Sequence, residues 1–174
     1  MRFFTFFGLT CLFLAGLLIW QRTNPNRLKF NLRQPPQETT ASASHLPISL
    51  VIKDLNLKLP IIPATLTGDR WPTTNQGVSY LTSSPVPGDT GNSVLYGHNW
   101  PNLLGPITKL KPGQQLEVTF SDQSSQSFTI AYTAVVTPDQ THILDQSSDS
   151  RLTLYTCIGF LDRKRFVITA IPQS

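Results

Sequence analysis

The beginning of the chain is its most apolar part. Between Phe3 and Trp20 the only polar interruptions are Thr5 and Thr10, and no charged residue occurs. As a helix, this run would be about 27 Å long, close to the roughly 30 Å hydrocarbon core of a bilayer. A cleaved signal peptide is disfavoured, because no small-residue cleavage site directly follows the run. We therefore expect a transmembrane anchor at residues 3–20.

Residues 21–45 have a different composition, which predicts a spacer between membrane and domain. They contain Pro25, Pro35 and Pro36 and a run of threonine, serine and alanine at 39–44, with no core-forming pattern. Proline and small polar residues favour extended or flexible chain over packed structure. We therefore expect an extracytoplasmic linker at 21–45 and one folded domain at 46–174.

After residue 45 the chain consists of short apolar stretches separated by turn residues, several with the period-two alternation of strands. The expected strands are Ile48–Ile52, Leu55–Ile62, Gly77–Leu81, Ser93–Tyr96, Gln115–Phe120, Ser127–Val136, Leu152–Thr156 and Arg165–Ile171. The expected helices are short, near Leu103–Leu110 and Thr141–Asp145. About eight short strands in one small domain favour an all-β fold with a closed or nearly closed β-barrel, which leaves no exposed sheet edges.

The net charge of +4 and the pI near 9.3 raise the question of nucleic-acid binding. The charge is unevenly distributed along the chain. Residues 1–43 carry five basic residues and one acidic residue, whereas residues 44–174 carry nine of each. A nucleic-acid-binding domain carries its positive charge on the folded part. The charge distribution therefore argues against a nucleic-acid partner.

The chain has two cysteines, and one of them lies in the predicted domain. Cys11 belongs to the apolar run and Cys157 to the barrel, so we expect no disulfide framework. A lone thiol is either a candidate nucleophile or a buried, inert side chain. One cysteine and one plausible histidine fall short of the three or four ligands of a zinc site. We therefore expect no metal and no cofactor.

The position of Cys157 at the end of its strand favours a reactive role. Alternate residues of a strand share one face of the sheet. Leu152 and Leu154 suit the core, whereas Thr153, Tyr155 and Cys157 occupy the opposite face. We expect the thiol to emerge beside Tyr155, at a groove on that face.

His98 is the best candidate for the base that such a thiol needs. It follows Gly97 at the end of the apolar strand Ser93–Tyr96. A thiol becomes a useful nucleophile when a base or a cationic neighbour favours the thiolate, and histidine supplies either near neutral pH. His45 falls in the linker and His142 among polar loop residues, so both are weaker candidates.

Arg165 opens the last expected strand, eight residues after the cysteine. An arginine beside a cysteine site can hold a substrate carbonyl or stabilise the oxyanion that develops on it. Arg163 and Lys164 compete for this assignment, with a solvated loop cluster as the alternative interpretation of all three. The position at the mouth of a strand favours Arg165.

Together these segments resemble the sortase family. Residues 153–157 (TLYTC) are similar to the family's T-L-x-T-C signature, and residues 87–98 (PGDTGNSVLYGH) to the stretch that leads to the family's histidine. Residues 107–113 (ITKLKPG) show a looser likeness, and the arginine-led RFVITA at 165–170 resembles the family's final strand. The likeness covers roughly residues 46–172, with histidine, cysteine and arginine in the family's order.

The resemblance implies an eight-stranded sortase barrel and a membrane-tethered cysteine transpeptidase. The Cys157 thiolate would attack a backbone carbonyl in a sorting motif similar to L-P-x-T-G, and an amine would resolve the resulting thioacyl-enzyme. His98 would act as general acid towards the leaving amine and as base for the incoming one. Arg165 would hold the substrate and stabilise the oxyanion. Thr156, which would assist Arg165, and Tyr155 are the expected substrate-binding residues.

The resemblance also implies partners and a location. The partners are surface proteins that bear a sorting motif, and an amine acceptor such as a cell-wall precursor or another protein subunit. Because this chemistry takes place at the cell surface, we expect a single-pass membrane protein with its catalytic domain outside. The flanking charges alone predict the opposite orientation. One basic residue, Arg2, precedes the span, and Arg22, Arg27, Lys29 and Arg33 follow it.

Two other functions stay open. With water as the acceptor, the same thiol chemistry gives a cysteine endopeptidase. With Cys157 merely buried, the domain is a non-enzymatic, membrane-tethered barrel that binds a partner. The acids of the domain form no cluster that would indicate a calcium site, although scattered acids such as Asp139 and Asp145 leave such a site open.

Overall fold

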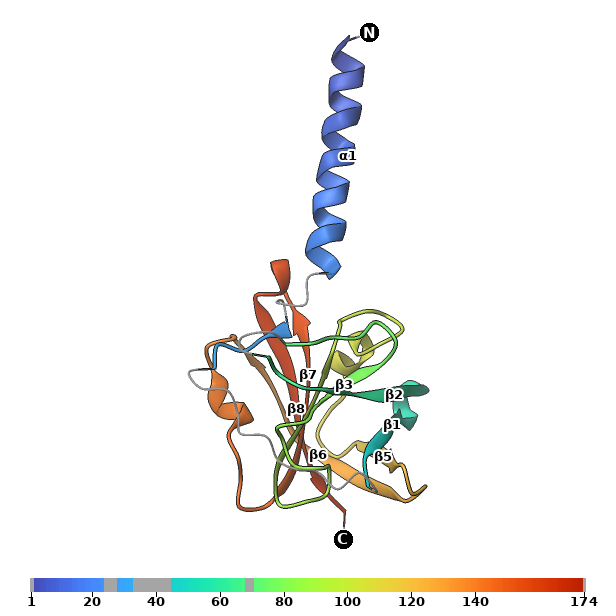
Figure 1. Cartoon of the computed structure of the whole chain (residues 1–174), viewed down its shortest axis with the longest axis vertical. Coiled ribbons are helices and arrows are strands. Elements are labelled where there is room, and N and C mark those ends of the chain that lie inside the picture. The colour runs from blue at the N-terminus through green and yellow to red at the C-terminus, as the bar shows by residue number, and fades with distance from the viewer. Residues whose placement is uncertain (1, 24–27, 33–44, 68–70, 174) are drawn as a thin grey trace.

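The computed structural model describes residues 2–23, 28–32, 45–67 and 71–173. It contains a helix, α1 (Arg2–Thr23), and a closed barrel of strands with short 3-10 turns (Figure 1). The strands are β1 (Pro47–Ile52), β2 (Leu57–Ala64), β3 (Val78–Leu81), β4 (Gly91–Gly97), β5 (Gln115–Phe120), β6 (Ser125–Val136), β7 (Ser150–Ile158) and β8 (Lys164–Pro172). The turns are η2 (Lys53–Leu55), η3 (Gly105–Lys109), η4 (Thr141–Leu144) and η5 (Phe160–Asp162).

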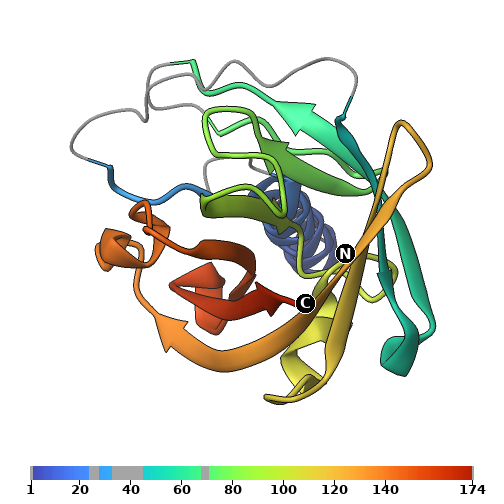
Figure 2. The same ribbon diagram turned by 90° about the horizontal axis from the view of Figure 1, so that it is seen from below.

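The order of the strands around the barrel differs from their order in the chain. It is β1-β2-β3-β4-β7-β8-β6-β5, and β5 pairs with β1 to close the barrel (Figure 2). The pairs β2–β3 and β4–β7 are parallel, and the other pairs are antiparallel. A parallel pair requires a crossover connection, and the segment with β5 and β6 crosses between β4 and β7. Because β4 and β7 run in the same direction, their carboxyl ends lie at the same end of the barrel.

The prediction of an all-β, eight-stranded closed barrel is confirmed, and both expected helices occur as 3-10 turns. The expected start of a strand at Leu55 is wrong. Asn56 has a positive φ of 49°, and its N–H bonds to the carbonyl of Lys53. This backbone conformation ends the turn η2, so β2 begins only at Leu57.

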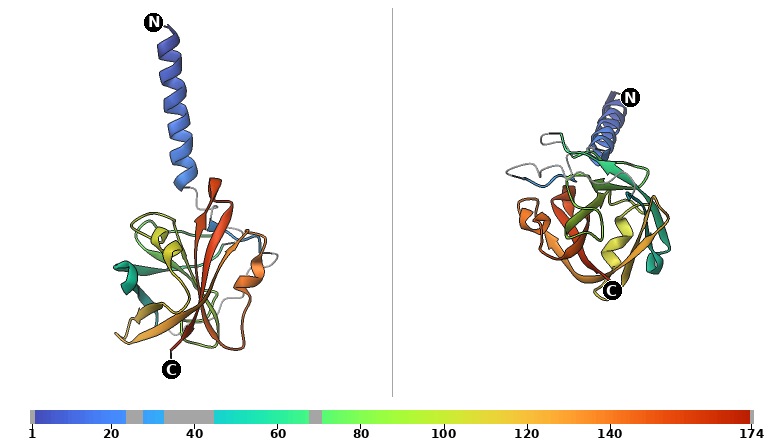
Figure 3. Two further views of the ribbon diagram at one scale, coloured as in Figure 1. Left: turned by 180° about the vertical axis from the view of Figure 1, so that it is seen from behind. Right: turned by 60° about the horizontal axis from the view of Figure 1, so that its bottom comes forward.

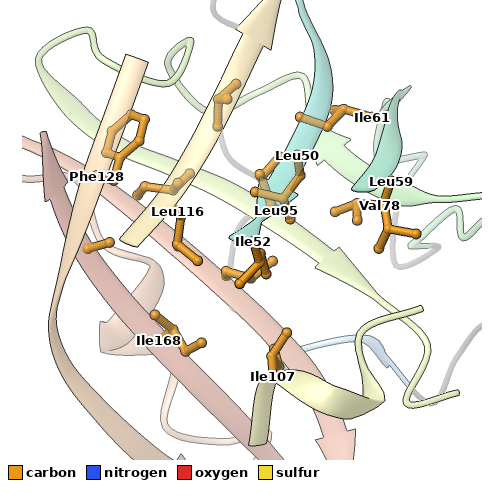
Figure 4. Close-up of a cluster of buried hydrophobic side chains, with 14 of the residues drawn as sticks. Leu50, Ile52, Leu59, Ile61, Val78, Leu95, Ile107, Leu116, Phe128 and Ile168 are labelled. Atoms are coloured by element: carbon orange, nitrogen blue, oxygen red, sulfur yellow. The ribbon is translucent and has the colours of Figure 1, made fainter. Parts of the chain in front are cut away.

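The interior of the barrel holds the main hydrophobic core, to which all eight strands contribute. Apolar side chains from neighbouring strands point toward one another, and Ile107 of η3 joins them (Figure 4). Leu152 and Leu154 belong to this core, as the alternation along their strand predicted. Burying one large apolar side chain stabilises the fold by about 1.5–3 kcal/mol, so this core holds the barrel closed.

A second apolar cluster, which we call the outer cluster, covers the other face of β4, β7 and β8. Its members on these three strands are Val94, Tyr96, Tyr155, Cys157 and Val167. They are joined by Leu28, Phe30, Ala64, Trp71, Leu81, Val136 and Leu144. The rings of Tyr96 and Tyr155 stack with centroids 5.5 Å apart and planes at 13°. The predicted alternation is therefore confirmed on both faces of β7.

Helix α1 contains residues 3–20, for which we expect a transmembrane anchor, and its side chains from Phe6 to Trp20 are exposed. Phe6, Phe13 and Trp20 are exposed by 78%, 71% and 66%. Figure 3 shows the helix outside the barrel from two further sides. Among the residues whose placement is described, no helix is both long enough and apolar enough to cross a membrane.

Candidate active site

The strand registers bring the three candidate catalytic residues to one end of the barrel. Gly97, the last residue of β4, pairs with Thr156 of β7, so His98 leaves β4 next to Cys157. On the other side of β7, Cys157 pairs with Arg165 of β8. Neighbouring strands lie about 4.8 Å apart, so the three backbones span about two strand spacings. β7 and β8 lie side by side in Figure 1, with these ends toward α1.

Cys157 lies on the outer face of the barrel, in the outer cluster rather than in the main core. Its side chain is only 3% exposed. The strand therefore directs the thiol out of the barrel, as expected, but other residues cover it. What covers the outer cluster decides whether a substrate reaches the sulfur.

Arg165 is the basic residue that the structure places in the site. Its side chain is 2% exposed, whereas Arg163 and Lys164 are exposed to solvent. The guanidinium donates to the carbonyls of Asp162 (2.7 Å), Lys164 (3.1 Å) and Lys29 (2.9 Å). Its Nε atom is buried and has no hydrogen-bond partner among the described residues. A buried, unused donor beside Cys157 suits the binding of a carbonyl or an oxyanion.

The two predicted substrate-binding residues are both fully buried. The Thr156 hydroxyl donates to the carbonyl of Gly97 at 2.8 Å, which ties the end of β7 to the end of β4. The Tyr155 hydroxyl donates to the carbonyl of Leu28 at 3.1 Å. Burial raises the pKa of the Tyr155 phenol well above its usual range, with Tyr96 adding to the shift, so Tyr155 stays a neutral donor. In this structure Thr156 positions a neighbouring strand, and the partner of Tyr155 is another part of the chain.

That part is a segment of the predicted linker, residues 28–32, which we call the strap. Leu28 and Phe30 are buried to 1% and 2% exposure in the outer cluster. The Phe30 ring meets Tyr155 edge-on, with centroids 5.0 Å apart, and lies 5.8 Å from the Arg165 guanidinium. The strap therefore covers the outer face of the barrel on which Tyr155 and Cys157 lie.

The far end of the strap is fastened to the connection between β6 and β7. The backbone N–H of Asn31 donates to the carbonyl of Pro138 at 3.0 Å, and its side chain bonds to the carboxylate of Asp139. The alternation of Leu28, Phe30 and Leu32 is the signal that could have indicated a packed segment within the linker.

Trp71 is a further component that the sequence did not single out. It is 2% exposed, and its ring meets Tyr96 at 74° with centroids 5.3 Å apart. It also lies 6.4 Å from the ring of Phe30. Trp71 thus forms, with Tyr96 and Tyr155, the aromatic surface on which the strap rests.

A cavity of about 220 Å³ lies beside the strap on the same outer face. Its apolar lining comes from Leu32, Leu81, Val94 and Leu144. It opens between the strap, the end of β3, β4 and the connection from β6 to β7. Its polar lining comes from Ser83, Ser84, Asp145 and Gln146, and Leu32 of the strap forms one wall, so this cavity exists only with the strap in place.

Asn92 of β4 holds one wall of this cavity. Its side-chain amide donates to the carbonyls of Ile143 (3.0 Å) and Asp145 (3.2 Å), and its carbonyl oxygen accepts from Thr153 (2.7 Å). Gln146 adds a bond to the Asn92 backbone N–H at 3.1 Å. A buried side chain with all these partners fixes the β6–β7 connection on the barrel.

His98 is half-buried, and its ring stacks on the ring of Trp100. The centroids are 4.7 Å apart and the planes are inclined by 12°. No group of three or more potential metal ligands occurs among the residues that the structure describes. The strand registers bring a thiol, an imidazole and a guanidinium to the same end of the barrel.

Comparison with known proteins assigns this arrangement to a family. The sortase domain matches residues 50–173. The chain belongs to the sortase family. This sortase is 25% identical to sortase A of Bacillus anthracis over 121 residues, which are 67% of the chain and 55% of that relative. It is 27% identical to sortase A of Listeria monocytogenes over 112 residues, 63% of the chain and 48% of the relative. The chain thus spans about half the length of the curated relatives it matches.

Solved sortase structures share the fold. A lid mutant of sortase A from Corynebacterium diphtheriae superposes with a TM-score of 0.64 at 25% identity, covering 76% of this chain and 73% of that one. Sortase A of Listeria monocytogenes superposes with a TM-score of 0.61 at 25% identity, covering 75% of this chain and 88% of that one. Sortase C of Clostridium perfringens superposes with a TM-score of 0.61 at 24% identity, covering 74% of this chain and 70% of that one. Membership of this family supports a transpeptidase role in general terms.

The contacts of Arg165 predict a difference between neighbouring basic residues of the sortase. Arg165→Ala leaves three carbonyls without their charged donor and should lower the free energy of unfolding by about 1–3 kcal/mol. Arg163→Ala is the matched control, because its side chain is exposed and should change stability by no more than about 0.5 kcal/mol. Urea denaturation of the two variants measures the difference. Equal losses of unfolding free energy in the two variants would contradict the assignment of Arg165, rather than Arg163, as the buried arginine.

Proposed function

We propose that this sortase is a cysteine transpeptidase that cleaves a sorting motif similar to L-P-x-T-G and joins the substrate protein to an amine. The observation that carries the proposal is the register of β4, β7 and β8, with Gly97 opposite Thr156 and Cys157 opposite Arg165. This register puts a thiol between a histidine and a buried arginine.

In the first half of the reaction the Cys157 thiolate attacks the carbonyl carbon of the scissile peptide bond. The negative charge that develops on the carbonyl oxygen is stabilised by the donors of Arg165. As the carbon–nitrogen bond breaks, His98 gives its proton to the leaving amine, and the released fragment carries the new amino terminus. The products are a thioester at Cys157 and a neutral imidazole.

In the second half an amine takes the place of the leaving group. His98 accepts a proton from the amine as its nitrogen attacks the thioester carbonyl. The carbon–sulfur bond breaks, a new amide forms, and Cys157 and His98 return to their starting protonation states. Water in place of the amine would give a carboxylate, which is the outcome of an endopeptidase.

The same proposal includes the setting of the enzyme. Residues 3–20 anchor it in the membrane, and the barrel lies outside the cell, where surface proteins with sorting motifs and amines of the cell wall or of other protein subunits are its partners. The support for the anchor is the uncharged apolar run from Phe3 to Trp20. No cofactor takes part in these steps.

The burial of Cys157 favours a second candidate, a barrel that binds a partner without chemistry. A thiol that is 3% exposed is also what an inert cysteine would show. The transpeptidase is supported by the position of the thiol, which lies on the outer face under a separate segment that a substrate could displace. A non-catalytic cysteine would also react with an alkylating reagent once exposed, but the protein would cleave no peptide.

A product analysis with the full chain in detergent separates these functions. A peptide library built around L-P-x-T-G is incubated with the enzyme, with and without a glycine-initiated peptide as amine, and the products are identified by mass spectrometry. We expect ligated product in the presence of the amine. Hydrolysed product alone, whatever amine is added, would support the endopeptidase, and an uncleaved library would refute the transpeptidase.

A further inference from the structure

The segment after β4 holds Trp100 in a rigid turn. The backbone N–H of Trp100 donates to the carbonyl of His98 at 2.9 Å, and its own carbonyl accepts from Leu103 and Gly105, both at 3.0 Å. The Leu104 N–H also donates to the carbonyl of His98, at 3.1 Å. A Cβ at Gly105 would lie 2.7 Å from the Trp100 carbonyl, so the tight turn depends on glycine at this position.

The side chain of Trp100 is as well supported as its backbone. The indole is partly buried and packs against the main core. Leu103 and Leu104, which follow it, are 2% and 0% exposed and belong to that core. The indole is therefore a flat apolar surface, held in place next to the end of β4.

The imidazole of His98 stacks on the indole of Trp100, with the two ring planes inclined by 12° and the ring centroids 4.7 Å apart. Stacked aromatic pairs contribute about 0.5–1.5 kcal/mol. Contact through the ring faces leaves the in-plane lone pairs and N–H groups of the imidazole directed away from the indole. The stack can therefore fix the ring plane without using either nitrogen.

We propose that Trp100 is a positioning residue for His98, holding the imidazole in the plane in which it exchanges protons with the substrate amines. This role rests on the transpeptidase function proposed above. An indole face also attracts a cation, by about 0.5–1 kcal/mol at a partly exposed site. Trp100 thus favours the protonated imidazole that must be present when the leaving amine departs.

Several titratable groups lie on the elements that adjoin His98. Tyr80 of β3 and Tyr96 of β4 remain neutral, because burial raises the pKa of Tyr80 to about 12 and that of Tyr96 further still. The remaining titratable and charged groups are Tyr155 and Cys157 on β7, Asp162 and Arg163 in the connection from β7 to β8, Lys164 and Arg165 on β8, and Lys109 in η3. The variants below leave all of these groups unchanged.

The kinetic test compares Trp100→Leu and Trp100→Phe in the full chain, with the exposed aromatic Tyr132→Leu as control. Trp100→Leu should lower kcat about tenfold, as the loss of a stacking contact of this size implies, while KM changes less than about twofold. The limb of the pH profile that depends on His98 should move to lower pH by about half a unit. Trp100→Phe keeps a ring face against the imidazole, so its kcat and its pH profile should stay close to those of the wild type. Wild-type kcat and pH profile in Trp100→Leu would overturn the proposal.

A fluorescence titration tests the contact without any substrate. A protonated imidazole quenches an indole that it touches, so the emission of the full chain should fall as His98 gains its proton. The change should disappear in His98→Gln and equally in Trp100→Phe, although Trp20 and Trp71 still emit. A titration that persists in Trp100→Phe would refute the stack.

The two experiments also separate this proposal from the proposed function. If no peptide is cleaved but the His98-dependent quenching is present, the stack stands and the transpeptidase fails. If Trp100→Leu does not fold, Trp100→Phe and the fluorescence titration decide, because phenylalanine retains the packing against the core.

Discussion

Cys157→Ala should abolish cleavage of sorting-motif peptides, with a loss of at least about 1000-fold in kcat/KM. The thiolate forms the bond that every later step depends on, and alanine offers no nucleophile in its place. Cys157→Ser should be nearly as inactive, because a hydroxyl is hardly ionised near neutral pH. The measurement is the rate of peptide cleavage followed by chromatography, in the full chain.

The fold of this variant should survive, which allows the loss to be assigned to chemistry. Cys157 is one member of a well-packed cluster, and removal of a single sulfur should cost about 1 kcal/mol of stability. Urea denaturation checks this value. Cys11→Ala is the matched control, since Cys11 is exposed on α1 and should leave cleavage unchanged. Cleavage that persists in the folded Cys157→Ala variant would refute the nucleophile and, with it, the transpeptidase.

Phe30→Ala should make Cys157 accessible, raising its rate of alkylation by at least about tenfold. The Phe30 side chain is 2% exposed and packs on Tyr155, and loss of a buried phenylalanine costs about 3–5 kcal/mol. Because the strap is a separate segment, this cost falls on its local opening rather than on unfolding of the barrel. The measurement is mass-spectrometric labelling with a small alkylating reagent in a Cys11→Ala background.

The same substitution should raise kcat/KM for a sorting-motif peptide. The Lys29 carbonyl occupies a donor of Arg165, and the strap lies over the outer face of the barrel, so a bound peptide has to displace it. Phe160→Ala is the matched control, because Phe160 is 80% exposed and covers nothing in the outer cluster. An unchanged alkylation rate in folded Phe30→Ala would show that the strap does not limit access to the thiol.

The cover over the site also affects which form of the protein is suitable for assays. A cut after residue 45, at the predicted end of the linker, removes Leu28 and Phe30 from the outer cluster. It also removes the acceptors of the Tyr155 hydroxyl and of one Arg165 nitrogen. Assays on such a fragment would report a site without its cover. The full chain is therefore the proper reference for activity and for thiol reactivity.

Much of the fold could be predicted because the information is local. Alternation of apolar and polar residues marks strands, and their number and shortness favour a closed barrel. Along β7 the same alternation assigned Leu154 to the core and Cys157 to the other face, as observed. The errors are local too. The strand start at Leu55 fails because Asn56 adopts a left-handed conformation, which asparagine tolerates and a hydrophobic pattern does not reveal.

The choice of Cys157, His98 and Arg165 came from the sequence, through strand-end positions and the likeness to sortases. The tertiary structure decided what each of them touches. It distinguishes Arg165, which is buried, from Arg163, which is exposed. The sequence alone does not show which of two arginines so close in the chain points inward. It also shows Trp100 beneath His98, a contact within one turn that no periodicity indicates.

The sequence alone thus predicted the strands, the two faces of β7 and the candidate residues for thiol chemistry. Those properties follow from patterns of a few residues. Only the tertiary structure decided that β4 and β7 are parallel neighbours and that the strap lies over the site. The hydrogen bond from Tyr155 to Leu28 joins residues 127 positions apart, and pairings at such separations depend on the global packing. The covered thiol is therefore a property of the folded chain and not of the signature around Cys157.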